Sequence, residues 1–183
     1  MKLVVAGTGY VGLVAGGCFS EMGHDGTCVD VGENKVRLME SGVSPIYEAG
    51  LEELMQKNNA AGRLHYTTDY KSAYRNPDAI FIGVGTPEQP DGSANLNYIA
   101  TVCREIAENV EQDCLVVVKS TVPVGTNDRV EQFIKDFLIR KELHIEVASN
   151  PEFLAQGSAV HDTLHAARII IGTESAQAEE KLR

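Results

Sequence analysis

The sequence contains no tryptophan, only four cysteines, and no apolar run long enough to cross a membrane. A transmembrane helix needs roughly 18 or more consecutive apolar residues. The N-terminus also lacks the basic stretch and the small-residue cleavage pattern of a signal peptide. We therefore expect a soluble, cytoplasmic protein without a membrane partner.

Basic residues are scarce as well. The chain has 16 Lys and Arg against 26 Asp and Glu, which gives a formal net charge of −10 and a pI near 4.9. A surface of that sign repels a phosphate backbone instead of attracting it. We therefore expect neither nucleic acid nor an anionic membrane as a partner.

Metal-binding and disulfide patterns are missing too. The four cysteines form no C-x-x-C pair, so neither a zinc site nor a disulfide framework is indicated. His161 and His165 lie one helical turn apart, but they lack the glutamate of an H-E-x-x-H motif and an evident third ligand. We expect reduced thiols and no metal.

What the sequence does contain is an alternation of short apolar runs with stretches of helical period. The runs are near-continuously apolar, as strands covered on both faces are: KLVVAG (2–7), GTCVDV (26–31), AIFIGVG (79–85), CLVVVKS (114–120), IEVASN (145–150) and RIIIGT (168–173). Intervening segments carry a 3.6-residue apolar stripe. The pattern predicts one domain over 1–183 of the α/β class, Rossmann-like and doubly wound. Its mostly parallel sheet has about six strands with helices on both faces.

Two connections are longer than such units need, at 41–54 and 85–98. Long ordered loops in compact domains are often functional. Ligands of this fold bind at the carboxyl ends of the strands. We therefore expect the second connection, which follows the predicted strand at 79–85, to shape a binding site.

The segment VVAGTGYVGL places Gly7, Gly9 and Gly12 in a G-x-G-x-x-G pattern between a predicted strand and an amphipathic helix. In that context Gly7 permits a tight turn, Gly9 lets the backbone approach a pyrophosphate, and Gly12 lets the helix pack closely. The helix N-terminus then supplies amide donors to the phosphates. The pattern predicts a dinucleotide-binding loop.

Asp30 follows the second predicted strand, 23 residues beyond Gly7. This is close to the spacing of about 20 residues expected for the carboxylate that accepts both ribose hydroxyls. A carboxylate there favours NAD, because it repels the 2′-phosphate of NADP. Lys35 is equally compatible with a place beside the ribose and with a solvated helix charge.

The stretch Gly16-Gly17-Cys18 offers a competing interpretation, that of a nucleophilic thiol flanked by glycines. Cys18, however, lies on the apolar stripe of the first helix, seven residues after Val11. A core-facing thiol is a small hydrophobe with a raised pKa and no access to substrate. Cys28 and Cys103 lie on buried patterns of the same kind, so we expect no nucleophile among the cysteines.

Two further motifs follow predicted strands at their carboxyl ends. KSTVPVGT presents the hydroxyls of Ser120 and Thr121, which can hold a water or an amide. The alternative is a Ser/Thr cluster that caps a helix. In ASNPEFL, Glu152 occupies a similar position, where a carboxylate can act as a general base.

Five segments, taken in order, resemble the NAD-binding domain of the UDP-glucose/GDP-mannose dehydrogenase family over essentially the whole chain. They are GTGYVGL (7–13), PIYEAGLEEL (45–54), GVGTPEQPDGSANL (83–96), KSTVPVGT (119–126) and NPEFLAQGSA (150–159). The resemblance implies an enzyme that oxidises UDP-glucose at C6 to the carboxylate with two NAD, through an aldehyde and a cysteine thioester.

Other interpretations remain open beside it. Within the family, GDP-mannose or UDP-N-acetylmannosamine can replace UDP-glucose. Outside it, a free-standing NAD-binding regulatory module explains the glycine loop and Asp30 but not the later motifs. A hydroxy-acid dehydrogenase should show a catalytic Lys or His, and none is evident.

By motif position, the resemblance also implies roles for individual residues. Those that contact the cofactor are Gly7, Thr8, Gly9, Tyr10, Val11, Gly12, Asp30, Lys35, Val84, Gly85, Thr86, Ser120, Thr121 and Gln156. Thr121 and Glu152 order the water that hydrolyses the thioester, and Glu152, Phe153 and Leu154 contact the sugar nucleotide. The family commonly has Glu where this chain has Gln156, which can hydrogen-bond a carboxamide but cannot act as a base.

The family's nucleophilic cysteine lies in a Gly-Gly-Ser-Cys motif beyond a long connecting helix, and residues 1–183 contain no such motif. We therefore expect a fragment without the central helix and the C-terminal sugar-nucleotide domain. It should bind NAD without completing the reaction. The full-length protein is expected to be a homodimer that acts on a UDP-sugar.

Overall fold

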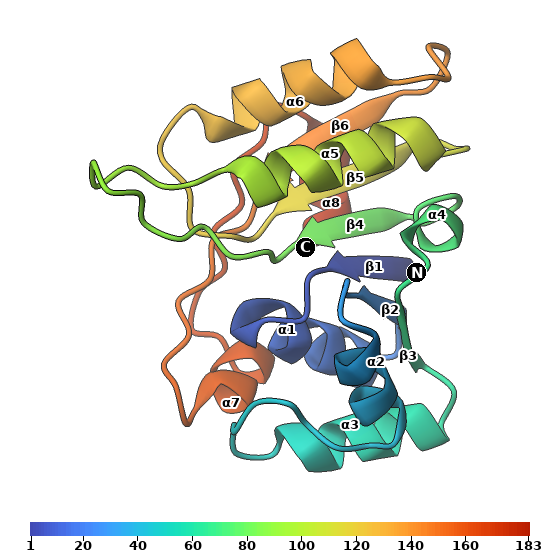
Figure 1. The fold of residues 1–183 in the computed structure, drawn as a ribbon, viewed down its shortest axis with the longest axis vertical. Helices are drawn as coiled ribbons and strands as arrows, with labels where there is room; N and C mark the ends of the chain where they lie inside the picture. Colours follow the sequence, from blue (N-terminus) through green and yellow to red (C-terminus); the bar gives the residue numbers. More distant parts are fainter.

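The computed structural model describes all 183 residues and contains one six-stranded sheet (Figure 1). The strands are β1 (Lys2–Ala6), β2 (Asp25–Val29), β3 (Leu64–Thr67), β4 (Ala79–Ile82), β5 (Cys114–Val118) and β6 (Ile145–Ser149). Their order is β3-β2-β1-β4-β5-β6, and every neighbouring pair is parallel. This is the Rossmann order, which places the topological switch between β1 and β4.

Helices cover both faces of the sheet, as the sequence predicted. One core includes residues of α1 (Tyr10–Glu21), α2 (Glu33–Glu40), α3 (Leu51–Ala60), α7 (Ala159–Leu164) and α8 (Ala176–Leu182). The other includes residues of α4 (Tyr70–Ala73), α5 (Asn97–Asn109) and α6 (Thr126–Phe137). No helix is both long and apolar enough to cross a bilayer.

Side-chain alternation along each strand decides which core a residue joins. In β1, Leu3 and Val5 pack in the first core, whereas Val4 and Ala6 pack in the second. All five residues of β5 are buried in the same two-sided way. This burial on both faces is why the central strands are continuously apolar instead of alternating.

One predicted strand is wrong and another was missed. The RIIIGT segment at 168–173 adds no strand to the sheet; its Gly172 forms a single antiparallel bridge with Ser149, and Ile169 and Ile170 are exposed. The sixth strand is instead β3, at the edge beside β2. Its residues alternate between buried and exposed positions, so it does not stand out as a continuous apolar run.

Candidate functional site

The loops that follow β1, β4, β5 and β6 emerge at one edge of the sheet, on the left in Figure 1. These loops carry the glycine pattern at 7–12, the long connection after β4, the KSTVPVGT motif and the NPEFL motif. They meet because the carboxyl ends of parallel strands share one edge, which is where doubly wound sheets bind their ligands.

The glycine loop turns sharply between β1 and α1. Gly7 has a φ of 92°, a conformation that favours glycine, and its amide donates to the carbonyl of Val29 at 2.8 Å. A Cβ on Gly12 would clash with the carbonyl oxygen of Gly7 and lie 3.3 Å from a methyl group of Val5. The helix therefore packs directly on the turn through backbone atoms.

The start of α1 presents free hydrogen-bond donors to open space. Gly9 is the N-cap residue, and no side chain caps the helix. The amides of Tyr10, Val11 and Gly12 donate no hydrogen bond inside the protein, as first-turn amides commonly do not. A Cβ on Gly9 would meet no atom within 4 Å. Free amides, a helix N-terminus and this open space fit a pyrophosphate.

Asp30, directly after β2, forms the next part of the site. Its carboxylate accepts hydrogen bonds from the amides of Thr8 (3.2 Å) and Gly32 (2.9 Å), from the Thr8 hydroxyl and from the Lys35 ammonium (2.9 Å). Burial by itself would raise the pKa of Asp30, but these hydrogen bonds outweigh it and lower the pKa to about 2. The group is therefore ionised at neutral pH and able to accept ribose hydroxyls.

Thr8 and Lys35 both contact this carboxylate, with different consequences. Thr8 is completely buried, so its side chain orients Asp30 and does not face a ligand. Lys35 forms an ion pair with Asp30 at 2.9 Å, and its side chain is 32% exposed. Lys35 is therefore held beside the Asp30 carboxylate and is not a free solvated charge.

The loops after β4 and β5 are joined by two hydrogen bonds. The Ser120 hydroxyl donates to the carbonyl of Val84 at 2.6 Å, and the Thr86 hydroxyl donates to the carbonyl of Thr121 at 2.8 Å. Ser120 is buried, whereas the hydroxyl of the exposed Thr121 is free of protein partners. The alternative role as a helix cap is wrong, because the N-cap of α6 is Gly125 and no side chain caps that helix.

After β6, the NPEFL segment contains the half-buried Glu152 and the exposed Phe153. The Glu152 carboxylate accepts the amide of Leu154 at 2.7 Å. Phe153 is 59% exposed, with the guanidinium of Arg168 5.7 Å from its ring centroid. Gln156 is exposed, and its side chain forms no hydrogen bond.

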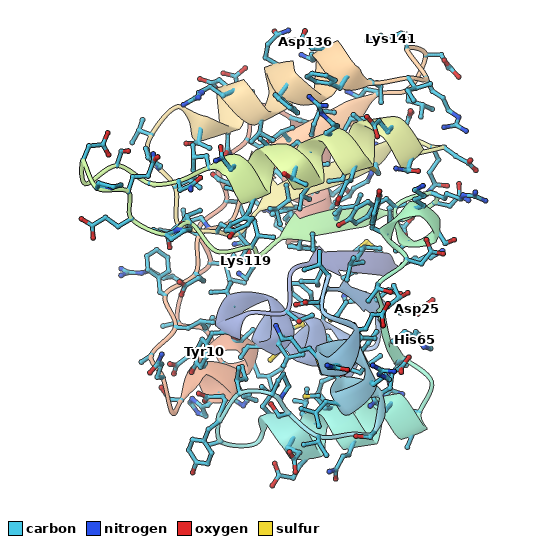
Figure 2. The ribbon with its side chains drawn as sticks, in the orientation of Figure 1. Tyr10, Asp25, His65, Lys119, Asp136 and Lys141 are labelled. Atoms are coloured by element: carbon cyan, nitrogen blue, oxygen red, sulfur yellow. The ribbon has the colours of Figure 1, made fainter.

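Lys119, which the sequence patterns did not single out, lies at the same edge (Figure 2). It is 9% exposed, and its ammonium donates to the side-chain oxygen of Asn150 at 3.0 Å. Burial lowers the pKa of Lys119, and the charge of Glu152 opposes that effect. The sequence signal that could have identified Lys119 is its position directly after a fully buried strand.

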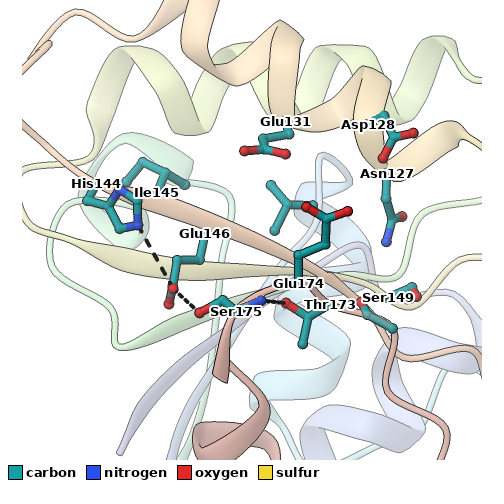
Figure 3. A pocket seen from close by; sticks show the side chains of 12 residues that line it. Asn127, Asp128, Glu131, His144, Ile145, Glu146, Ser149, Thr173, Glu174 and Ser175 are labelled. Carbon is teal, nitrogen blue, oxygen red and sulfur yellow. Dashed lines mark hydrogen bonds and ion pairs between the residues drawn. The ribbon is translucent and has the colours of Figure 1, made fainter. Parts of the chain in front are cut away.

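Two cavities differ in how well their position and the charge of their lining residues suit a dinucleotide. One of about 770 Å³ borders Thr86 and Thr121 at the carboxyl edge. The other, of about 480 Å³, lies beside α6 and β6 (Figure 3). Its walls carry four carboxylates, those of Asp128, Glu131, Glu146 and Glu174. Clustered negative charge repels a pyrophosphate, so the carboxyl edge suits a dinucleotide better than this cavity does.

The thiols are all inside the two cores. Each is buried, and burial raises the pKa of each to about 12: Cys18, Cys28, Cys103 and Cys114. The interpretation of Cys18 as a core residue is confirmed. No thiol in these 183 residues is placed to attack a substrate.

Comparison with known proteins agrees with this geometry. The whole chain, residues 1–183, matches the model of the UDP-glucose/GDP-mannose dehydrogenase family, NAD binding domain. The chain belongs to this family. It is 53% identical over 173 residues to the UDP-glucose 6-dehydrogenase YwqF of Bacillus subtilis, an alignment that covers 94% of this chain and 39% of that protein.

Solved structures of the family superpose closely on this NAD-binding domain. GDP-mannose dehydrogenase from Pseudomonas aeruginosa does so with a TM-score of 0.94 at 41% identity, and UDP-glucose dehydrogenase from Pyrobaculum islandicum with 0.94 at 39%. Each comparison covers 100% of this chain and 43% of the other. The domain thus spans well under half of the length of these relatives. The sequence resemblance and the choice of NAD are confirmed.

Proposed function

We propose that this domain binds NAD across the β1–β4 switch point and serves an NAD-dependent enzyme that oxidises UDP-glucose to UDP-glucuronate. The observation that carries the proposal is the pairing of two features at one edge of the sheet. The uncapped start of α1 offers free amides to open space, and the ionised carboxylate of Asp30 lies beside the same loop.

In this proposal the loop 7–12 holds the pyrophosphate, and Asp30 accepts the adenosine ribose hydroxyls with Lys35 beside it. Val84, Gly85 and Thr86 border the cofactor. Thr121 and Gln156 reach the nicotinamide end, supported by their exposure and by the absence of protein partners for their side chains. The Ser120 hydroxyl already donates to the carbonyl of Val84, so Ser120 stabilises the loop at the nicotinamide end.

NAD, when bound, accepts a hydride from the substrate carbon. The full reaction that we propose uses two NAD and passes through an aldehyde and a cysteine thioester. Thr121 and Glu152 hold the water that hydrolyses the thioester, and Glu152, Phe153 and Leu154 contact the sugar nucleotide. The exposed ring of Phe153 supports a contact with a ligand on this side.

The nucleophile of this reaction is not among the 183 residues. Burial holds the pKa of all four thiols near 12, and the thiolate is the reactive form. We therefore infer that these residues alone bind NAD but do not complete the reaction. Steady reduction of NAD by this chain in the presence of UDP-glucose would contradict the inference.

Calorimetric titration of the 183-residue chain tests the site. We expect NAD binding that weakens at least tenfold in Asp30→Ala, because the ribose hydroxyls lose their charged acceptor. We also expect NADP to bind more weakly than NAD to the unchanged chain. Equal affinity for the two cofactors would contradict the role of Asp30.

GDP-mannose is a second candidate substrate. The structure of the GDP-mannose dehydrogenase superposes on this domain as closely as that of the UDP-glucose dehydrogenase. The ratio of kcat/KM for the two nucleotide sugars, measured on the full-length protein, distinguishes them.

We further propose that the full-length protein is a homodimer. Light scattering of the full-length protein measures its oligomeric state.

A further inference from the structure

Glu48 is a buried carboxylate that the chemistry above does not use. It lies in the PIYEAGLEEL segment just before α3, and it is 5% exposed. Its Oε2 accepts hydrogen bonds from the Tyr10 hydroxyl and, at 2.7 Å, from the amide of Gly157. Its Oε1 accepts the amide of Ala159 at 2.8 Å. Three segments that are distant in the sequence therefore meet on one carboxylate.

The chemistry of this junction requires an ionised acid. All three partners of Glu48 are donors, and a carboxylate has acceptor sites only. The hydrogen bond from Tyr10 lowers the pKa of Glu48, and the amides of Gly157 and Ala159 lower it further. Burial, with help from the bond to Glu48, raises the pKa of Tyr10 to about 12, so its hydroxyl keeps its proton. A glutamine would turn an NH₂ donor toward one of the donors.

The junction joins the cofactor loop to the segment that carries Gln156. Tyr10 is the first residue of α1, directly after Gly9, and Figure 2 shows it where α1 approaches α7. Its hydroxyl also lies 3.5 Å from the carbonyl of Ala155. The contacts to 155, 157 and 159 thus bracket Gln156, whose own side chain is exposed and forms no hydrogen bond.

We propose that Glu48 is a positioning residue for the nicotinamide half of the NAD site. It fixes the segment 155–159 opposite the glycine loop, so that Gln156 is held in place before the cofactor arrives. Such preorganisation lowers the entropic cost of binding. The adenosine half, built on Asp30 and Lys35, shares no hydrogen bond with Glu48. This inference rests on the NAD site proposed above.

Two ligands distinguish the nicotinamide half of the NAD site from the adenosine half. We would titrate the chain and its Glu48→Gln variant with NAD and with ADP-ribose, which lacks the nicotinamide. NAD should bind at least fivefold more weakly to the variant, whereas the affinity for ADP-ribose should stay within twofold. Glu53→Gln is the matched control, because Glu53 lies in the same motif, is exposed and has no hydrogen-bonded partner for its side chain. It should leave both affinities unchanged.

A second variant keeps the test decisive if Glu48→Gln does not fold by circular dichroism. Tyr10→Phe removes one donor and leaves the bonds to Gly157 and Ala159, so we expect a two- to threefold loss of NAD affinity that exceeds any loss of ADP-ribose affinity. Where Glu48→Gln does fold, faster hydrogen exchange confined to the amides of Gly157 and Ala159 supports the same conclusion.

Unchanged NAD affinity in a folded Glu48→Gln chain would overturn the proposal. Equal losses for NAD and ADP-ribose would also overturn it, because they indicate a purely structural role. If the unchanged chain binds neither ligand, the proposed NAD site itself fails. If it binds both ligands but Glu48→Gln does not weaken NAD binding more than ADP-ribose binding, the proposed NAD site is supported and the proposed role of Glu48 is contradicted.

Discussion

At the residue scale, Asp30, the proposed acceptor of the ribose hydroxyls, is held in place by groups of its own chain. Four donors hold its carboxylate: two from Thr8, one from Gly32 and one from Lys35. Its side chain is only 14% exposed, so solvent screens these contacts weakly. The same contacts that orient the carboxylate also stabilise the folded state when the group is ionised.

Asp30→Asn should therefore cost stability in a pH-dependent way. The folded pKa of about 2 lies below the ordinary 3.8, so the contribution is present above pH 4 and is lost as the pH falls toward 2. We expect a loss of about 2 kcal/mol at pH 7, from a shift of about two pKa units. Urea unfolding at pH 7, 5 and 3 measures it, and the difference from the unchanged chain should shrink at pH 3.

The exposed Asp25, the first residue of β2, is the control. Asp25→Asn should change the free energy of unfolding by less than about 0.5 kcal/mol, the usual range for surface substitutions. An Asp30→Asn cost that is the same at every pH would contradict the assignment.

At the scale of elements, the turn from β1 into α1 depends on its three glycines for different reasons. Gly7 has a positive φ, Gly12 leaves no room for a Cβ, and Gly9 faces open space. The first two are requirements of folding. Gly9 has no such packing constraint, which is what the proposed approach of a pyrophosphate to the backbone requires.

The pair Gly9→Ala and Gly12→Ala separates these reasons. We expect Gly12→Ala to lose about 3 kcal/mol of stability, because its Cβ meets rigid backbone. Gly9→Ala, at the N-cap of α1, should cost only about 1 kcal/mol and yet bind NAD at least tenfold more weakly. Chemical denaturation and calorimetry measure the two effects. Normal NAD binding by Gly9→Ala would show that the pyrophosphate does not lie against this residue.

The strands show where local patterns succeed and fail. The central strands were predicted well because burial on both faces forces continuous apolar runs. The edge strand β3 was missed because one of its faces is partly exposed. The segment 168–173 has a strand-like sequence, but it crosses the end of β6 with a single bridge at Gly172. Whether an apolar run joins a sheet depends on its neighbours, which sequence alone does not show.

At the scale of the whole molecule, the sheet divides the interior into two cores, and the thiols are distributed between them. Cys18 and Cys28 lie in one core, and Cys103 and Cys114 lie in the other. All four are at most 2% exposed. Their reactivity therefore reports on the integrity of the fold as a whole.

Thiol titration tests this arrangement. We expect fewer than one of the four thiols to react with a disulfide reagent in the native chain at pH 8, because burial suppresses both access and ionisation. All four should react in concentrated guanidinium chloride. Rapid reaction of one native thiol would reopen the question of a nucleophile within this chain.

Local sequence patterns were enough to predict the fold class, the glycine turn between β1 and α1, the place of Asp30 after β2 and the burial of Cys18. Each of these follows from local regularities: strand burial, glycine spacing, the chain length of one βαβ unit and the helical period. Other features come from the packing of separate elements. It turned Ser120 toward Val84, placed β3 in the sheet instead of 168–173, and brought Glu48 to amides 109 and 111 positions away. Such contacts depend on how separate elements pack, and no local pattern encodes that packing.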